Sequence, residues 1–253
     1  DLRRSRGLGD VYKRQAYVND QVYLLEVNPR ASRTIPFVSK ALGIPLARIA
    51  ARVMAGKSLK ELDFKGVPDI KGFCVKEAVM PFNKFQNVDP ILGPEMRSTG
   101  EVMGIGDTFA EAFEKAEVAA GVEIPKTGSV FISVRDTDKQ FLSEIIPSLD
   151  QEGFKLIATK GTANVIKDMG YKVIQIKKVL EGRPNIIDLM KNKEVNLVIN
   201  TTEGRESIQD SASIRRTALD QKICCTTTIQ GAKAICEVLS KKVDWSYKKL
   251  QDN

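Results

Sequence analysis

From Ser129 to Lys241 the sequence alternates short apolar segments with segments of helical periodicity. The predicted strands are Ser129–Val134, Phe154–Ala158, Lys172–Ile176, Asn196–Ile199 and Ile223–Thr226. The predicted helices are 138–152, Thr162–Met169, Pro184–Asn192, Asp210–Leu219 and 228–241. Strands that are apolar throughout and are separated by helices are typical of a parallel sheet with helices on both faces. The sequence therefore predicts an α/β domain built on a five-stranded, Rossmann-like parallel sheet.

The first half of the chain has a mixed pattern of strands and helices. Two β-prone runs on either side of Asn19-Asp20-Gln21 predict a hairpin. The other predicted elements are helices at Thr34–Leu42 and Pro45–Met54, a strand at 72–81, a loop at 82–98 and an amphipathic helix at 109–120 that Thr108 caps. Gly121–Gly128 contains Pro and two Gly, which indicates a linker. We therefore expect two domains, residues 16–123 and residues 124–253.

The first 15 residues differ from the rest of the chain. They contain five Lys or Arg against two Asp, and show neither helical nor strand periodicity. Such a stretch is either a basic arm that binds nucleic acid or an end foreign to the fold. We favour the foreign end, because nothing downstream supports DNA binding.

The composition excludes several classes of protein and of chemistry. With 42% hydrophobic and 28% charged residues and a net charge of +7, the 253-residue chain is typical of a folded, soluble protein. Because it contains no histidine, Ser-His-Asp and Cys-His catalysis and histidine-ligated zinc are excluded. We find neither an apolar run of about 18 residues nor a signal peptide. Four cysteines without a CxxC pair suit a reducing compartment, so we expect a cytoplasmic protein.

Polar side chains follow each predicted strand, and ligands bind at the carboxyl ends of the strands of such sheets. In chain order these residues are Ser133, Arg135 and Lys139; Thr159, Lys160, Gly161 and Thr162; Lys178 and Arg183; Asn200, Thr201 and Thr202; and Thr226, Thr227 and Thr228. Hydroxyls at a helix N-terminus and nearby cations suit a phosphate group. The loops therefore predict a site for a phosphate monoester with polar groups for a sugar and a base. Each Thr or Asn alone could instead be a helix cap or a turn former.

A second candidate site lies at the end of the predicted hairpin. Strand alternation places Glu26 and Asn28 on the same face, where their oxygens could share a hard cation such as Mg²⁺. Arg30 nearby could hold a phosphate through its planar guanidinium. The pattern is short, and a polar strand end with a satisfied arginine explains it at least as well.

Several runs of this sequence resemble the large subunit of carbamoyl phosphate synthetase. The most specific are EVNPRASRT from Glu26 and GPEMRSTGEVMG from Gly93. In the second half they are SVRDTDK, ATKGTA, EGRPNI, NTTEGR, DSASIRRTAL and TTIQGA. The similarity runs in order from about residue 16 to about residue 245. It corresponds to the C-terminal quarter of that family's chain, which comprises the tail of the second ATP-grasp domain and a methylglyoxal-synthase-like regulatory domain.

The resemblance implies roles for particular residues. Glu26 and Asn28 would be Mg²⁺ or Mn²⁺ ligands at the second ATP site, with Arg30 as a catalytic residue near the phosphates. An effector nucleotide, UMP as inhibitor or IMP as activator, would contact Lys139, Thr159, Thr162, Lys178, Asn200 and Thr202, with Ser133 close by. Ornithine would bind Glu77, Asp210, Thr227 and Thr228.

The resemblance also implies an activity and partners. The family makes carbamoyl phosphate from bicarbonate, ATP and ammonia for arginine and pyrimidine synthesis, and a glutaminase small subunit supplies the ammonia from glutamine. The implied partners are that subunit and the rest of the large chain, with neither nucleic acid nor a membrane. The glycine-rich loop that covers the nucleotide and most ATP-binding residues have no counterpart here, and the first 15 residues do not match. We therefore expect this chain alone to be inactive.

Three alternatives stay open at this point. A free-standing lyase of the methylglyoxal synthase type is disfavoured because related enzymes use an Asp and a His, and this chain has no His. A nucleic-acid-binding module is disfavoured because aromatic residues make up only 6% and no helix gathers Lys and Arg on one face. The third alternative is a non-catalytic nucleotide-binding module.

Overall fold

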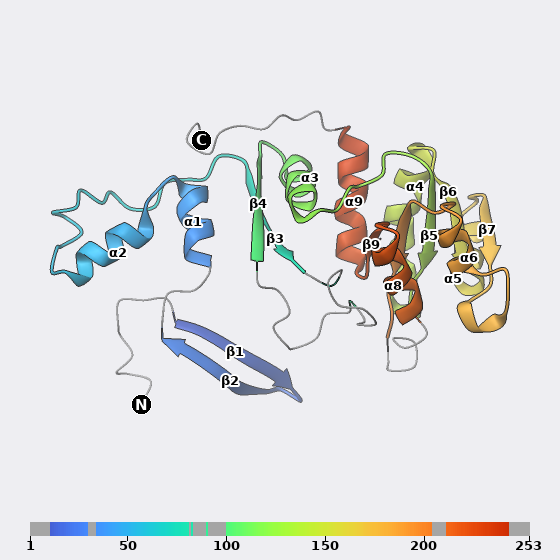
Figure 1. The fold of residues 1–253 in the computed structure, drawn as a ribbon, viewed down its shortest axis with the longest axis horizontal. Helices are drawn as coiled ribbons and strands as arrows, with labels where there is room; N and C mark the ends of the chain where they lie inside the picture. The colour runs from blue at the N-terminus through green and yellow to red at the C-terminus, as the bar shows by residue number, and fades with distance from the viewer. Residues whose placement is uncertain are drawn as a thin grey trace. The chain divides into compact units, whose positions relative to one another are not determined.

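The computed structural model describes residues 11–29, 34–80, 82, 90, 100–203 and 211–242 (Figure 1). Within these ranges the side chains of residues 11–15 and 25–29 are not described. The predicted loop at 82–98 lies almost wholly outside the described residues. The chain packs as two compact units, of which the first ends at Lys71 and the second begins at Gly72. The predicted domain boundary at residues 123 and 124 stays a prediction.

The first unit contains the predicted hairpin and two helices. Strands β1 (Val11–Val18) and β2 (Gln21–Pro29) pair antiparallel. Both turn residues have positive φ, 51° at Asn19 and 59° at Asp20, a backbone that Asn and Asp tolerate and that suits a tight hairpin. The hairpin is confirmed, but β1 begins at Val11, inside the stretch for which we expected no strand. Helices α1 (Thr34–Leu42) and α2 (Leu46–Met54) follow as predicted, and neither buries a side chain.

Helices α1 and α2 also bear on membrane insertion. No single helix in the described part of the chain is long and apolar enough to cross a membrane. Only α1 and α2 taken together reach that length and hydropathy, and they are bent by 112° at the break between them.

The second unit begins with an antiparallel pair and a helix. Strands β3 (Phe73–Val79) and β4 (Gly100–Gly106) pair antiparallel, and helix α3 (Phe109–Ala120) follows. The Thr108 cap is confirmed, because the backbone N–H of Glu111 donates to Thr108 Oγ1 at 3.2 Å. Strand β4 was not predicted, since its three glycines lower its strand propensity.

The rest of the second unit is the predicted parallel sheet. Its strands are β5 (Ser129–Ser133), β6 (Lys155–Thr159), β7 (Val173–Ile176), β8 (Leu197–Asn200) and β9 (Cys224–Thr226), in the order β7-β6-β5-β8-β9. All neighbouring strands are parallel. The helices are η2 (Asp136–Phe141), α4 (Leu142–Gln151), α5 (Lys160–Asp168), η3 (Val179–Glu181), α6 (Ile186–Lys191), α8 (Ala212–Asp220) and α9 (Ile229–Lys241). The α/β fold class is confirmed.

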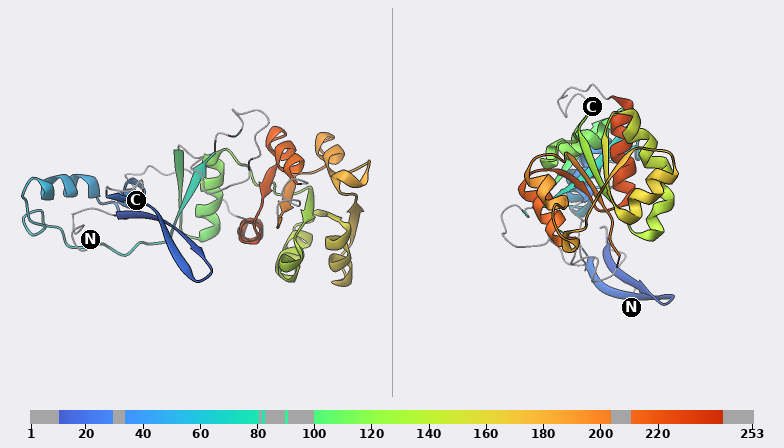
Figure 2. Two further views of the ribbon diagram at one scale, coloured as in Figure 1. Left: turned by 90° about the horizontal axis from the view of Figure 1, so that it is seen from below. Right: turned by 90° about the vertical axis from the view of Figure 1, so that its right-hand side faces the viewer.

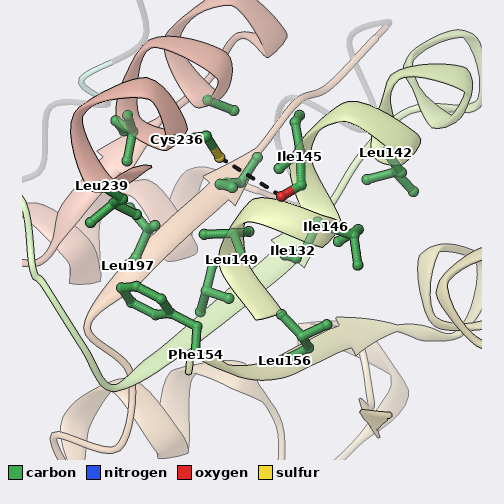
Figure 3. Close-up of a cluster of buried hydrophobic side chains, with 14 of the residues drawn as sticks. Ile132, Leu142, Ile145, Ile146, Leu149, Phe154, Leu156, Leu197, Cys236 and Leu239 are labelled. Carbon is green, nitrogen blue, oxygen red and sulfur yellow. Dashed lines mark hydrogen bonds between the residues drawn. The ribbon is translucent and has the colours of Figure 1, made fainter. Parts of the chain in front are cut away.

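Two apolar cores cover the two faces of this sheet. The right-hand view of Figure 2 shows helices on both sides of the sheet. On β5, Val130 and Ile132 belong to one core, and Phe131 belongs to the other. The first core includes side chains of α4, α5 and α9; Figure 3 shows α4 packed on α9 and the sheet. The second includes side chains of α6 and α8. Ala110 of α3 is fully buried in the first core, so α3 contributes to the same core as α9 and the sheet.

Candidate functional site

The strand order places a binding site between β5 and β8. The chain proceeds from β5 to β6 and β7 on one side, then returns to add β8 and β9 on the other. Ligands bind at such a reversal, outside the carboxyl ends of the strands. A cavity of about 910 Å³ lies at this place. Its polar and charged lining residues are Ser133, Arg135, Asp136, Lys139, Thr159, Thr162, Lys178, Glu181, Asn200, Thr201, Thr202, Glu203 and Ser211.

The cavity brings together every residue that the resemblance implied for the effector nucleotide. They are Ser133, Lys139, Thr159, Thr162, Lys178, Asn200 and Thr202. The loop after β9, which we had grouped with the others, does not line the cavity. Instead Thr228 caps α9, because its Oγ1 accepts the backbone N–H of Gly231 at 3.0 Å. Strand β9 lies at the edge of the sheet, one strand away from the reversal.

Hydroxyl groups tie the loops of the cavity together. Thr162 Oγ1 accepts the backbone N–H of Val134 at 3.2 Å, and Ser133 Oγ lies 3.2 Å from Thr159 Oγ1. Both threonines are buried. These bonds fix the loops after β5 and β6, and each hydroxyl keeps capacity for a further hydrogen bond.

The first turn of α5 forms one wall of the cavity. Helix α5 begins at Lys160, and the first N–H groups of a helix have no partner within it. A Cβ added at Gly161 would lie 3.2 Å from Lys139 Nζ, so this ammonium group lies over the turn. Unpaired N–H groups and an adjacent cation together favour an anion.

Asn200 is the polar group in the cavity with the least satisfied side chain. It is 1% exposed, and neither Nδ2 nor Oδ1 has a hydrogen-bond partner among the described residues. Burying an amide without partners destabilises a fold by about 1–3 kcal/mol. A ligand with a donor and an acceptor would remove that cost.

Two cations of the cavity, Lys139 and Arg135, form ion pairs with carboxylates. Lys139 Nζ lies 2.7 Å from Asp136 Oδ1, and Lys139 holds the pKa of that carboxyl below its usual range. Arg135 donates from Nε to Asp138 Oδ2 at 2.9 Å, and its backbone N–H donates to Thr201 Oγ1 at 3.1 Å. The sequence did not lead us to predict Asp136 and Asp138 at this site, because a phosphate site is expected to offer cations and hydroxyls.

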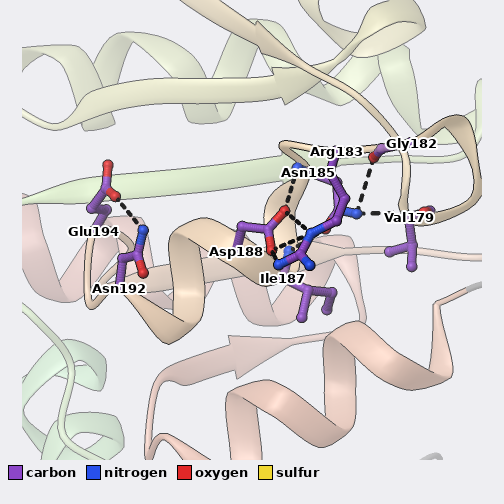
Figure 4. A network of polar contacts seen from close by, with 8 residues as sticks. All are labelled: Val179, Gly182, Arg183, Asn185, Ile187, Asp188, Asn192 and Glu194. Atoms are coloured by element: carbon purple, nitrogen blue, oxygen red, sulfur yellow. Dashed lines mark hydrogen bonds and ion pairs between the residues drawn. The ribbon is translucent and has the colours of Figure 1, made fainter.

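A network of hydrogen bonds fixes the loop that carries Lys178 (Figure 4). The backbone N–H of Lys178 donates to Glu181 Oε2 at 2.9 Å. Asn185 donates from Nδ2 to the carbonyl of Gly182 at 3.1 Å, and Arg183 donates from Nε to Asp188 Oδ1 at 3.0 Å. The guanidinium of Arg183 therefore stabilises this loop, and Arg183 does not line the cavity.

The residues implied for ornithine are not brought together by described contacts. Glu77 lies half-buried on β3, and burial raises its pKa. Burial, with the nearby Glu77 carboxylate as a second cause, raises the pKa of Glu117 to about 7. Thr227 and Thr228 precede α9, and Asp210 lies outside the described residues. No described hydrogen bond or ion pair joins Glu77 to either threonine.

The implied metal ligands lie on the hairpin. Glu26 and Asn28 are two residues apart in β2, hence on one face of the strand, but their side chains and the whole of Arg30 lie outside the description. Within the described residues, no cluster of three or more Cys, Asp or Glu could hold a metal ion. Glu26 and Asn28 by themselves offer two donors to a cation that takes six or more.

Comparison with known proteins decides the family. A family model described as "MGS-like domain" matches residues 142–227, and one described as "Carbamoyl-phosphate synthase L chain, ATP binding domain" matches residues 7–62. Over 237 residues, 94% of this chain, it is 56% identical to the carbamoyl phosphate synthase large chain of Pseudomonas syringae pv. tomato and 57% identical to that of Pseudomonas putida. The chain belongs to the carbamoyl phosphate synthase large-chain family.

The chain spans 22% of the length of those large-chain relatives. The match to the ATP-binding domain model begins at residue 7, inside the stretch that we expected to be unmatched. A solved methylglyoxal synthase from Elizabethkingia anophelis NUHP1 matches 45% of this chain and 79% of its own, with a TM-score of 0.38 and 18% identity.

Proposed function

We propose that this chain is the C-terminal, regulatory part of a carbamoyl phosphate synthase large chain, an ATP-dependent carbon–nitrogen ligase. The whole enzyme would make carbamoyl phosphate from bicarbonate, ATP and glutamine-derived ammonia for arginine and pyrimidine synthesis in the cytoplasm. Its partners would be a glutaminase small subunit and the rest of the large chain. The function of this part is to bind an effector mononucleotide, UMP or IMP, in the cavity at the carboxyl edge of the sheet.

One observation carries this proposal: the buried amide of Asn200 lacks partners in the same cavity into which the first turn of α5, Lys139 and Lys178 converge. The α5 turn and the two ammonium groups favour a phosphate, and the amide favours a base or a ribose. A mononucleotide presents both chemistries on one molecule. A cavity of about 910 Å³ is large enough for it.

The test is calorimetric titration of UMP and IMP into the wild type, Lys178→Ala and Lys160→Ala. Removing Lys178 takes away a charge-assisted contact worth roughly 1.5–3 kcal/mol, so affinity should fall about ten- to a hundred-fold. Lys160 is the matched control, because it is an exposed lysine on α5 that does not line the cavity. Wild-type binding weaker than millimolar for both nucleotides, or unchanged binding by Lys178→Ala, would contradict the proposal.

We propose that this chain on its own does not make carbamoyl phosphate. Glu26 and Asn28 would supply two of the ligands for Mg²⁺ or Mn²⁺, which would neutralise ATP phosphates in the whole enzyme, and Arg30 would lie near those phosphates. Two donors cannot complete a metal shell. ATP turnover by the purified chain that depends on bicarbonate and ammonia would refute this.

We also propose that ornithine binds beside Glu77, with Asp210, Thr227 and Thr228 as further contacts. Burial raises the pKa of both carboxylates, Glu77 and Glu117, and the Glu77 carboxylate raises the pKa of Glu117 further. A cationic amine would relieve the repulsion. Glu77→Gln should therefore weaken ornithine binding and leave UMP binding unchanged in the same titration.

A further inference from the structure

We propose that Asp136 is a built-in counter-anion of this cavity: its carboxylate holds Lys139 when the cavity is empty and competes with the ligand phosphate for that lysine. The inference rests on the proposed function, because it assumes that the cavity takes a phosphorylated ligand. Asp136 would weaken binding of the ligand, whereas the other residues proposed for this cavity would strengthen it.

The position of the ammonium group supports competition. Lys139 Nζ lies over the first turn of α5, next to Gly161, where a phosphate would also be held. The same Nζ lies 2.7 Å from Asp136 Oδ1. The carboxylate is therefore within one hydrogen bond of the cation that the phosphate needs. The positive charge of Lys178 also helps to lower the pKa of the Asp136 carboxyl.

A comparison with Asp138 shows that the Asp136 side chain can move away from Lys139 at little cost. Asp138 has an 8% exposed side chain and receives the Arg135 guanidinium at 2.9 Å, so it is part of the folded loop. The side chain of Asp136 is 93% exposed, and Lys139 is its one ion-pair partner among the described residues. Rotating the Asp136 side chain into water leaves no buried group unpaired.

The physical consequence is a lower affinity than the cations alone would give. The ligand phosphate must displace the Asp136 carboxylate from Lys139 or bind next to a like charge. The attraction between Asp136 and Lys139 and the repulsion between Asp136 and a doubly charged phosphate both oppose binding, and solvent weakens both effects. Removing the carboxylate should therefore strengthen binding by about two- to ten-fold.

The experiment measures binding of UMP, IMP and inorganic phosphate to the full chain at low and high salt. The variants are Asp136→Asn and Asp136→Ser, which both remove the carboxylate. Asp150→Asn is the matched control, because Asp150 is an exposed carboxylate at the end of α4 that does not line the cavity. Both Asp136 variants should bind the anions about two- to ten-fold more tightly at low salt, and the gain should shrink at about 0.5 M salt.

The outcomes separate this inference from the proposed function. Wild-type binding without a gain in the Asp136 variants would overturn the counter-anion and leave the nucleotide site standing. An equal gain in Asp150→Asn would also overturn it, because net charge alone would then explain the effect. If no chain binds any of the three anions, the proposed function fails and the inference fails with it.

Discussion

At the scale of single residues, the buried amide of Asn200 destabilises the ligand-free fold, and a bound ligand would remove this cost. Asn200 is 1% exposed and its amide is unpaired among the described residues. Replacing it with leucine, which is of similar size, should stabilise the ligand-free chain by about 1–2 kcal/mol. The same change should weaken mononucleotide binding about ten-fold or more, since a ligand group loses its partner. Urea unfolding and calorimetry measure the two effects.

A matched control for Asn200→Leu is Asn192→Leu. Asn192 is exposed at the end of α6 and does not line the cavity. That variant should bind nucleotides as the wild type does. If Asn200→Leu destabilises the ligand-free chain, the amide has partners in solution and the argument for a ligand at this position fails.

Glu117 predicts a pH dependence of stability. Burial and the Glu77 carboxylate raise the pKa of Glu117 from its ordinary value of 4.5 to about 7. Between these values the unfolded chain releases the proton and the folded chain retains it, so stability falls as pH rises through this window and stays lower above it. Glu117→Gln abolishes this loss. It should be more stable than the wild type by roughly 1–3 kcal/mol at pH 8 and about equal at pH 4.5.

Denaturant titrations at pH 4.5 and pH 8 test the Glu117 prediction. Glu123→Gln serves as the control, because Glu123 is an exposed carboxylate that follows α3. It should show no pH-dependent gain over the wild type. A Glu117→Gln chain that is less stable than the wild type at pH 8 would mean that the carboxylate is ionised and paired.

At the scale of elements, the close packing of β4 explains why the sequence did not predict this strand. The contact requires a glycine, and glycines lower strand propensity. A Cβ added at Gly104 would lie 1.9 Å from the carbonyl oxygen of Ala112, so α3 approaches the bare backbone of the strand. Gly104→Ala should therefore destabilise the chain by about 2–4 kcal/mol in urea unfolding. Gly100→Ala in the same strand is the control, because its Cβ would meet Val79 Cβ at an ordinary 3.8 Å. Equal effects of the two changes would refute the close-contact argument.

The five parallel strands could be predicted because burial on both faces leaves a local signal, a run of apolar residues such as Val130 to Ile132. Strand order leaves no such signal, because it depends on pairing between distant segments. This is why Thr226 to Thr228 were grouped with the cavity although β9 lies at the sheet edge. Asp136 and Glu203 could have been found only by asking which charges lie beside the predicted cations.

At the scale of the whole molecule, the two compact units differ in how much they bury. Helices α1 and α2 of the first unit bury no side chain. Hydrophobic burial is the main stabilising term in folding, so two helices without it have little to offset their conformational entropy. We therefore expect α1 and α2 to add little to the free energy of unfolding of the chain.

The second unit should fold without the first, and truncated chains can show at which residue this unit begins. The sequence predicts a domain boundary between residues 123 and 124, yet the core includes Ala110 of α3, before this boundary, as well as the 3% exposed Ile124 just after it. A chain starting at Gly72 should therefore unfold in one cooperative transition. Its melting temperature should be close to that of the sheet in the whole chain. A chain starting at Lys126 loses both core residues, and burying one isoleucine contributes about 1.5–3 kcal/mol. Its melting temperature should be lower by roughly 5–10 °C. Equal melting temperatures by circular dichroism would show that α3 adds nothing to the sheet, and would support the boundary at residues 123 and 124.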